Sequence, residues 1–212
     1  MATPRTVVIT RPEDAPRAVA EVGGTAVLKG RAPGLTHKSD IGAVALGVRP
    51  AGAERAFQRI AERIAAWDAD AAREAAVLAQ TQVAEGLELL LSVRRAEDGY
   101  PPLVSVALGG TRTEIWQDIR TAVCPLDPAG ARALLDGLRF RRLLHGFRDE
   151  PAVDVDAVVD ALVGVSRLAV ALDGRLDLEV NPLIVHPEGK GATAVDLVAA
   201  LAGPQAEGSG CE

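Results

Sequence analysis

The chain has 212 residues, of which 48% are hydrophobic and 25% are charged, a composition typical of a folded globular protein rather than a disordered one. A net charge of -6 and an aromatic content of 3% argue against a nucleic-acid-binding protein, because such surfaces are basic and stack bases on aromatic rings. Cys124 and Cys211 are too few and too far apart to indicate a zinc cluster or a disulfide framework.

No apolar stretch of the sequence approaches the roughly 20 residues that span a bilayer. The first residues, MATPRT, also lack the apolar region of a signal peptide. We therefore expect a cytoplasmic protein with no membrane partner and no nucleic-acid partner.

Hydrophobic periodicity in the first third of the chain predicts short strands alternating with helices. An exposed loop rich in glycine separates the second and third strands. The predicted strands are residues 6–10, 25–30 and 43–48, and the predicted helices are residues 12–22 and 53–67.

The remainder of the chain begins with three strands that can form one antiparallel sheet, at residues 75–83, 87–93 and 102–108. Helices are then predicted at residues 131–138, 139–145 and, after an N-cap at Asp154, up to Asp173. A closing hairpin of residues 176–185 and 192–198 and a last helical turn at residues 197–201 complete the predicted elements. We expect residues 203–212 to form a flexible tail, because they are small and polar.

The closing hairpin carries three oxygen-bearing side chains that we expect to lie close together. Glu179 and Asn181 are two residues apart and therefore leave the same face of the strand. If the hairpin folds symmetrically about residues 188–189, Asn181 lies across from Asp196. Two carboxylates and an amide oxygen suit Mg²⁺, although the solvent-facing side of an ordinary hairpin explains the same spacing equally well.

Two positions in the first third of the chain are candidates for phosphate chemistry. Lys29 ends a short strand, where a buried lysine needs an anionic partner and a surface lysine needs none. His37 follows in the loop, with Asp40 three residues later, and a histidine on an exposed loop is either a base, a nucleophile or a bystander.

Adjacent glycines at positions 109 and 110 follow the strand predicted at residues 102–108. Glycine lets the backbone amides approach a phosphate or acyl group closely, but two glycines are also typical of a plain turn.

Five motifs in this order resemble the ATP-grasp domain of NDP-forming acyl-CoA synthetases. They are VLKG at 27–30, HKSDIG at 37–42, GLE at 86–88, LGGTRTE at 108–114 with Asp118, and EVNPLIV at 179–185. That family includes the ADP-forming acetate–CoA ligases and, more distantly, the β subunit of succinyl-CoA synthetase. The resemblance implies an α+β protein of the ATP-grasp fold, in which two lobes with antiparallel sheets clasp a nucleotide. The domain would cover residues 1–202, with lobes at about 1–74 and 75–202.

The resemblance also implies roles for individual residues. Lys29 is similar by position to the lysine that reaches the nucleotide phosphates. His37 resembles the histidine of a swinging loop, which relays a phosphoryl group between an acyl-phosphate site on a companion module and bound ADP. Gln80 and Glu88 fall in the hinge region that contacts adenine and ribose.

Asn181 and Asp196 match the Mg²⁺ ligands of the family, and Glu179 would support them. The residues that resemble the loop facing the companion module are Gly109, Gly110 and Glu114.

By this resemblance the chain would be part of an ADP-forming acid–thiol ligase that uses ATP or ADP and Mg²⁺. A companion subunit would bind CoA and complete a hetero-oligomer, and the substrate would be a small carboxylic acid or its acyl-CoA. Family members usually have one more helix before the first strand, and a basic residue where this sequence has Ala122. These departures favour a regulatory, non-catalytic binding module as the alternative. A carboxylate–amine ligase, which needs no phosphohistidine, is the other alternative.

Overall fold

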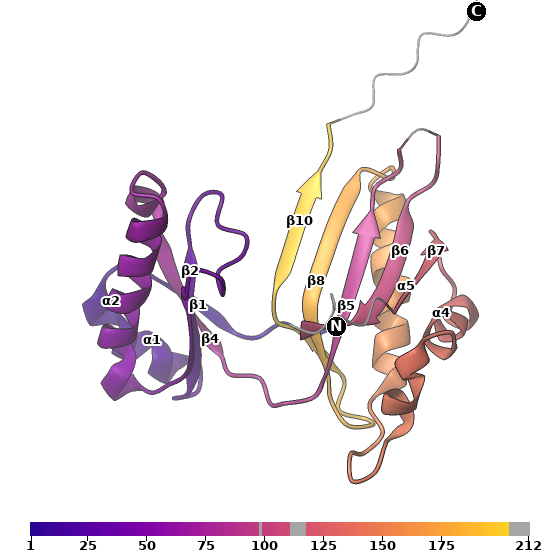
Figure 1. The fold of residues 1–212 in the computed structure, drawn as a ribbon, viewed down its shortest axis with the longest axis horizontal. Helices are drawn as coiled ribbons and strands as arrows, with labels where there is room; N and C mark the ends of the chain where they lie inside the picture. The colour runs from indigo at the N-terminus through magenta and orange to yellow at the C-terminus, as the bar shows by residue number, and fades with distance from the viewer. Residues whose placement is uncertain (98, 111–117, 204–212) are drawn as a thin grey trace, which may run out of the picture. The chain divides into compact units, whose positions relative to one another are not determined.

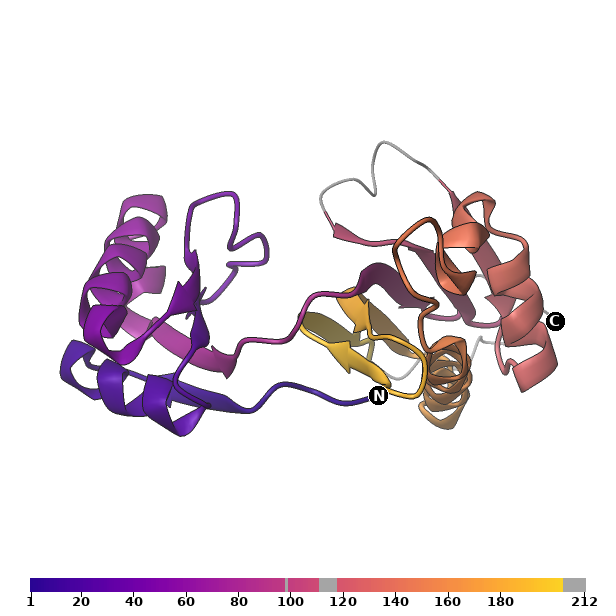
Figure 2. The ribbon, with the colours of Figure 1, turned by 90° about the horizontal axis from the view of Figure 1, so that it is seen from below.

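The computed structural model describes residues 1–97, 99–110 and 118–203, which form two compact units (Figures 1 and 2). One unit is Pro4–Val83, and the other comprises Met1–Thr3 and the chain from Ala84 onward. Each unit has one antiparallel sheet with helices packed on one face, which confirms the predicted α+β class. None of the helices in the described part of the chain is long and apolar enough to cross a membrane.

The first unit contains a four-stranded sheet in the order β1-β4-β2-β3. Its strands are β1 (Thr6–Ile9), β2 (Ala26–Arg31), β3 (Val44–Val48) and β4 (Ala76–Thr81). Its helices are the 3-10 helix η1 (Pro12–Asp14), α1 (Ala15–Glu21), α2 (Pro50–Trp67) and the 3-10 helix η2 (Ala71–Glu74). Because β4 pairs with both β1 and β2, it belongs to this unit. The lobe boundary expected at residue 74 therefore differs from the division after Val83.

The alternation of β2 separates a helix-covered face from an open one. Leu28 is fully buried in the core beneath the helices. A Cβ atom at Gly30 would lie 2.8 Å from Cδ1 of Ile64, so α2 packs directly against this face of β2. Since neighbouring side chains of a strand point to opposite faces, Lys29 belongs to the face that the helices leave open.

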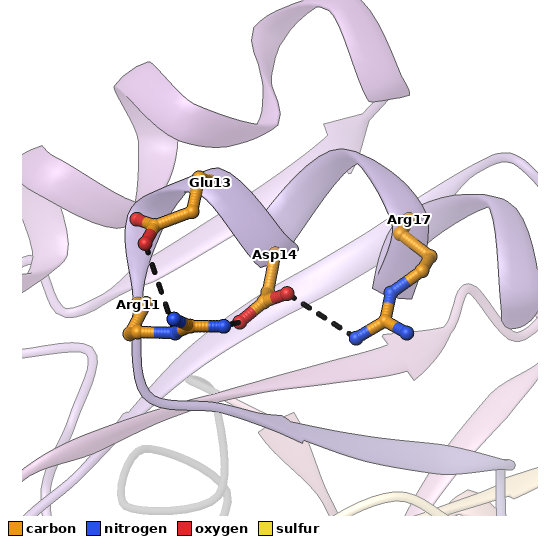
Figure 3. A network of polar contacts seen from close by, with 4 residues as sticks. All are labelled: Arg11, Glu13, Asp14 and Arg17. Atoms are coloured by element: carbon orange, nitrogen blue, oxygen red, sulfur yellow. Dashed lines mark hydrogen bonds and ion pairs between the residues drawn. The ribbon is translucent and has the colours of Figure 1, made fainter.

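A network of charged side chains surrounds the start of α1 (Figure 3). Both Arg11 and Arg17 bind the carboxylate of Asp14, at 2.9 Å and 3.2 Å, and Glu13 lies 3.7 Å from Arg11. The Asp14 carboxylate, more than that of Glu13, raises the pKa of the Arg11 guanidinium. These pairs lie at the surface, where such contacts contribute little to stability. The helix predicted at residues 12–22 is thus a 3-10 turn followed by an α-helix.

The second unit contains a six-stranded sheet in the order β10-β8-β5-β6-β7, with β9 also paired to β8. Its strands are β5 (Leu87–Arg94), β6 (Leu103–Leu108), β7 (Ile119–Val123), β8 (Leu176–Val185), β9 (Ala192–Ala194) and β10 (Leu197–Leu201). Its helices are α4 (Pro128–Asp136), the 3-10 helix η4 (Arg139–His145) and α5 (Val155–Ala171). The helices cover one face of the sheet and close an aliphatic core over it (Figure 1).

The helical turn predicted at residues 197–201 is wrong, because these residues form strand β10. Leu197 pairs with Val180 and Leu201 pairs with Leu176, so β10 extends along the same edge of β8 that β9 occupies. The short apolar run LVAAL carries no clear period, and pairing with β8 decides its conformation.

Asp154 joins the start of α5 to the turn between β8 and β9. Its Oδ1 atom accepts a hydrogen bond from the amide of Ala157 at 3.0 Å, and its Oδ2 atom accepts one from Gly191 at 2.8 Å. Its own amide donates to the carbonyl of His186 at 2.8 Å. The bonds from Gly191 and Ala157 lower the pKa of the Asp154 carboxyl, because they stabilise its charged form.

We expect Asp154→Ala to lower the free energy of unfolding by about 1–2 kcal/mol, because it removes a helix cap and a turn contact. The carboxylate contributes fully above its ordinary pKa of about 4, and its contribution is lost as pH falls through the lowered folded-state pKa. Urea unfolding at several pH values measures this difference. Coincident curves for the two proteins at neutral pH would contradict the assigned role, and Asp154→Asn, which keeps a capping oxygen, should lose less.

Candidate functional site

Lys29 is a buried residue on the face of the first sheet that the helices of this unit do not cover. Only 4% of the residue is exposed, and it pairs with Val44 of β3 and Leu78 of β4. The interpretation of Lys29 as a surface lysine is therefore wrong. A charged amine in such a place needs negative charge nearby to offset its loss of hydration, which makes Lys29 suitable for holding an anion.

Gln80 lies on the same face of the sheet as Lys29. In β4 it stands directly across from Val27, two residues before Lys29 in β2. Its Nε2 atom donates to the hydroxyl of Thr6 at 3.2 Å, whereas its buried Oε1 atom has no hydrogen-bond donor among the described residues. Because buried acceptors normally have a partner, this oxygen is compatible with the predicted contact to a nucleotide base. That contact stays a prediction.

His37 lies in the exposed loop between β2 and β3, as its sequence context predicts. The loop is closed by hydrogen bonds from the amide of Asp40 to the carbonyl of His37, at 3.2 Å, and from Ala43 to Lys38, at 2.9 Å. Thus Lys29 and His37 belong to one unit, but the first is buried in a strand and the second is accessible to solvent.

In the second unit, the hairpin has the predicted register. The amide of Asn181 donates to the carbonyl of Asp196 at 3.0 Å, and the amide of Val195 donates to Pro182 at 3.1 Å. Asn181 and Asp196 therefore stand opposite each other, both half-buried. Glu179 is exposed and pairs further along the strand, with Val198.

Glu88 and the two glycines adjoin Asn181, a grouping that the sequence did not predict. The amide of Gly109 donates to the carbonyl of Glu88 at 2.8 Å, and the amide of Gly110 donates to Oδ1 of Asn181 at 3.3 Å. Gly110 has φ +74°, and a Cβ atom there would overlap the Glu88 carboxylate. Only glycine suits this position. The antiparallel register of β5 and β6, in which Leu89 pairs with Leu108, is the signal that could have placed Glu88 beside the glycines.

The second unit offers oxygen ligands that fit Mg²⁺ in combination with a phosphate. Among the described residues, no group of three or more His, Cys, Asp and Glu side chains is arranged to hold a metal ion. Mg²⁺, however, is usually bound by one or two protein ligands and completed by water and substrate phosphates. The carboxylate of Asp196 and the amide oxygen of Asn181 are ligands of this chemical kind, and their role in binding Mg²⁺ stays a prediction.

Glu114 of the glycine motif at 108–114 and the nearby Asp118 have different outcomes. Glu114 lies outside the described residues. Asp118 is buried, and its Oδ2 atom accepts hydrogen bonds from the amides of Arg139 and Phe140, at 2.6 Å and 3.2 Å. Asp118 therefore fixes the start of η4.

Comparison with known proteins finds ADP-forming acetate–CoA ligases among the relatives of this chain. The chain is 32% identical over 182 residues to acetate–CoA ligase [ADP-forming] I of Archaeoglobus fulgidus, which covers 85% of this chain and 26% of the relative. It is 28% identical to the β subunit of acetate–CoA ligase [ADP-forming] II of Pyrococcus furiosus, covering 87% of this chain and 78% of that subunit. The chain thus spans about a quarter of the first relative and most of the second.

Solved structures agree with these relatives. Acetyl-coenzyme A synthetase 1 of Ca. Korarchaeum cryptofilum, in complex with coenzyme A and Ca-AMPCP, matches with a TM-score of 0.86 and 28% identity. The match covers 95% of this chain and 86% of that one. A complex of the same enzyme with Mg-AMPPCP, whose phosphohistidine segment points towards the nucleotide binding site, matches with a TM-score of 0.78 and 28% identity, over 95% and 85% of the two chains. The ATP-grasp domain family matches residues 1–201, and the chain belongs to that family.

Proposed function

We propose that this chain is the nucleotide-binding part of an ADP-forming acyl-CoA synthetase, which transfers a phosphoryl group between ATP or ADP and an acyl phosphate. The observation that carries this proposal is the pairing of Asn181 with Asp196 across the β8 hairpin. Relatives named as ADP-forming acetate–CoA ligases and a neighbour bound to coenzyme A and Mg-AMPPCP support the same assignment.

In this function the chain acts mainly by positioning charge. The ammonium of Lys29 stabilises negative charge on the transferred phosphoryl group, most effectively because the residue is shielded from water. Asn181 and Asp196 would hold Mg²⁺ beside the nucleotide phosphates. Mg²⁺, when bound, neutralises phosphate charge and supplies electrostatic stabilisation of the transition state. Gln80 and Glu88 contact the base and the ribose.

His37 is the group that carries the phosphoryl. One imidazole nitrogen bonds to phosphorus as the bond between phosphorus and the acyl oxygen breaks, releasing the carboxylate. The phosphorus–nitrogen bond then breaks as the terminal oxygen of ADP bonds to phosphorus and forms ATP. The exposure of His37 on a loop supports this role, since the nitrogen must reach two different partners.

A companion CoA-binding subunit completes the enzyme in this proposal. A relative named as a β subunit covers most of this chain, which supports a hetero-oligomer in which CoA and the small carboxylic acid bind to the other subunit.

Incubation with γ-labelled ATP and Mg²⁺ tests the carrier role. We expect an acid-labile label on His37, located by mass spectrometry of the peptide, and none on the His37→Asn variant. Asparagine keeps a polar side chain of similar reach without a nucleophilic nitrogen.

Lack of label on the unaltered chain, both with and without a companion subunit, would contradict the proposed function. Nucleotide binding without label would instead identify a regulatory module. Acyl transfer to an amine that persists in His37→Asn would identify a carboxylate–amine ligase.

A further inference from the structure

The loop that carries His37 is flanked by two glycines in a left-handed conformation. Gly34 has φ +75° and Gly42 has φ +68°, backbone values that residues other than glycine rarely adopt. Leu35 and Ile41, next to these glycines, pack partly buried against the core of the first unit. The loop is therefore held at both ends, and His37 is exposed between them.

Both glycines lie against the last turn of α2. A Cβ atom at Gly34 would be 3.7 Å from Cη2 of Trp67, and one at Gly42 would be 3.8 Å from Nε of Arg63. One helical turn thus lies beside both ends of the loop, with room for little more than a Cβ atom between them, although the two glycines are eight positions apart in sequence.

Between these contacts the loop and the helix leave an open groove of about 530 Å³. Residues 39–42 line it from the loop side, and Arg63, Ala66 and Trp67 line it from the helix side. Trp67 is 41% exposed, and within the described part of the chain Arg63 makes no ion pair. The middle of the loop is therefore separated from α2 by the groove, whereas Gly34 and Gly42 lie close to the helix.

We propose that Trp67 and Arg63 are positioning residues for His37, and that the last turn of α2 supports the His37 loop. We call this turn, residues 63–67, the seat of the loop. Trp67 limits movement about Gly34, and Arg63 limits movement about Gly42, so that the loop keeps the direction in which it presents His37. This inference rests on the proposed function for its catalytic consequence, but the seat itself is a property of the first unit alone.

The first test uses fluorescence and needs no nucleotide. The chain has two tryptophans, so Trp116→Phe leaves Trp67 as the sole emitter. In that background, replacing residues 34–42 with a Gly/Ser segment of equal length should increase acrylamide quenching of Trp67, because the loop is then no longer held beside the ring. Unchanged emission and unchanged quenching would contradict the proposal that the last turn of α2 supports the His37 loop.

The second test measures the rate of His37 phosphorylation together with the affinity for ATP. Trp67→Ala and Arg63→Gln should each slow labelling by about tenfold and leave the Kd for ATP unchanged, because they disturb the position of the nucleophile only. Trp67→Phe should retain most of the rate. Arg59→Gln, an exposed arginine on the same helix outside the groove, is the matched control and should label normally.

Equal labelling rates in all four variants would overturn the positioning role. A parallel loss of ATP affinity in Trp67→Ala and Arg63→Gln would also overturn it, since that result indicates general disruption. If the unaltered chain acquires no label, the proposed function fails, and the quenching experiment alone decides whether the seat exists.

Discussion

Replacing Lys29 with methionine is expected to weaken the binding of Mg–ATP by about 100-fold, equal to about 3 kcal/mol. Methionine has a similar length and fills the same space in β2, but it carries no charge. The effect is large because Lys29 is only 4% exposed, so water cannot replace the lost ammonium beside a phosphate. Isothermal titration calorimetry of the variant and the unaltered chain gives the two dissociation constants.

The matched control is Lys190→Met, at an exposed lysine in the turn between β8 and β9. This variant removes the same charge from the chain but leaves Lys29 in place. Its affinity for Mg–ATP should therefore equal that of the unaltered protein. Thermal unfolding of Lys29→Met establishes that the fold is retained. Equal affinities for Lys29→Met and Lys190→Met would exclude Lys29 from phosphate binding.

Asp196→Asn is expected to remove most of the dependence of ATP binding on Mg²⁺. An amide is nearly the same size as a carboxylate and leaves the backbone bond to Asn181 in place, but it binds a divalent cation more weakly. We expect the affinity for ATP to fall by about tenfold or more at millimolar Mg²⁺ and to change little in its absence. Titrations of ATP at several Mg²⁺ concentrations measure this dependence.

Two further variants serve as controls for the assignment of Asp196 as a Mg²⁺ ligand. Glu188→Gln changes an exposed carboxylate in the β8–β9 turn and should leave the Mg²⁺ response unaltered. Glu179→Gln should have a smaller effect than Asp196→Asn, because Glu179 pairs two residues away from the Asn181 position. An undiminished Mg²⁺ response in Asp196→Asn would refute the metal site.

Local patterns in the sequence predicted the parts of the site that depend on neighbouring residues. Strict alternation in β2 separates Lys29 from Leu28, so the face that carries Lys29 follows from spacing alone. The pairing of Asn181 with Asp196 followed from the position of the hairpin turn, because a turn fixes the register of both strands.

Features that depend on distant pairing were not predicted. The strand at Ala76–Thr81 has the same local pattern whichever sheet it joins, and its pairing with β1 and β2 moves the division between units to Val83. Likewise, the contact between Gly110 and Asn181 needs β5 to lie between β6 and β8, an order that nearby residues do not specify.

The most direct test of the account is a calorimetric titration of the unaltered chain with ATP, with and without Mg²⁺. We expect one nucleotide per chain and tighter binding when Mg²⁺ is present, since Asn181 and Asp196 then share the metal with the phosphates. Absence of binding at millimolar ATP, or binding with the same affinity in the presence of Mg²⁺ and of a chelator, would contradict it.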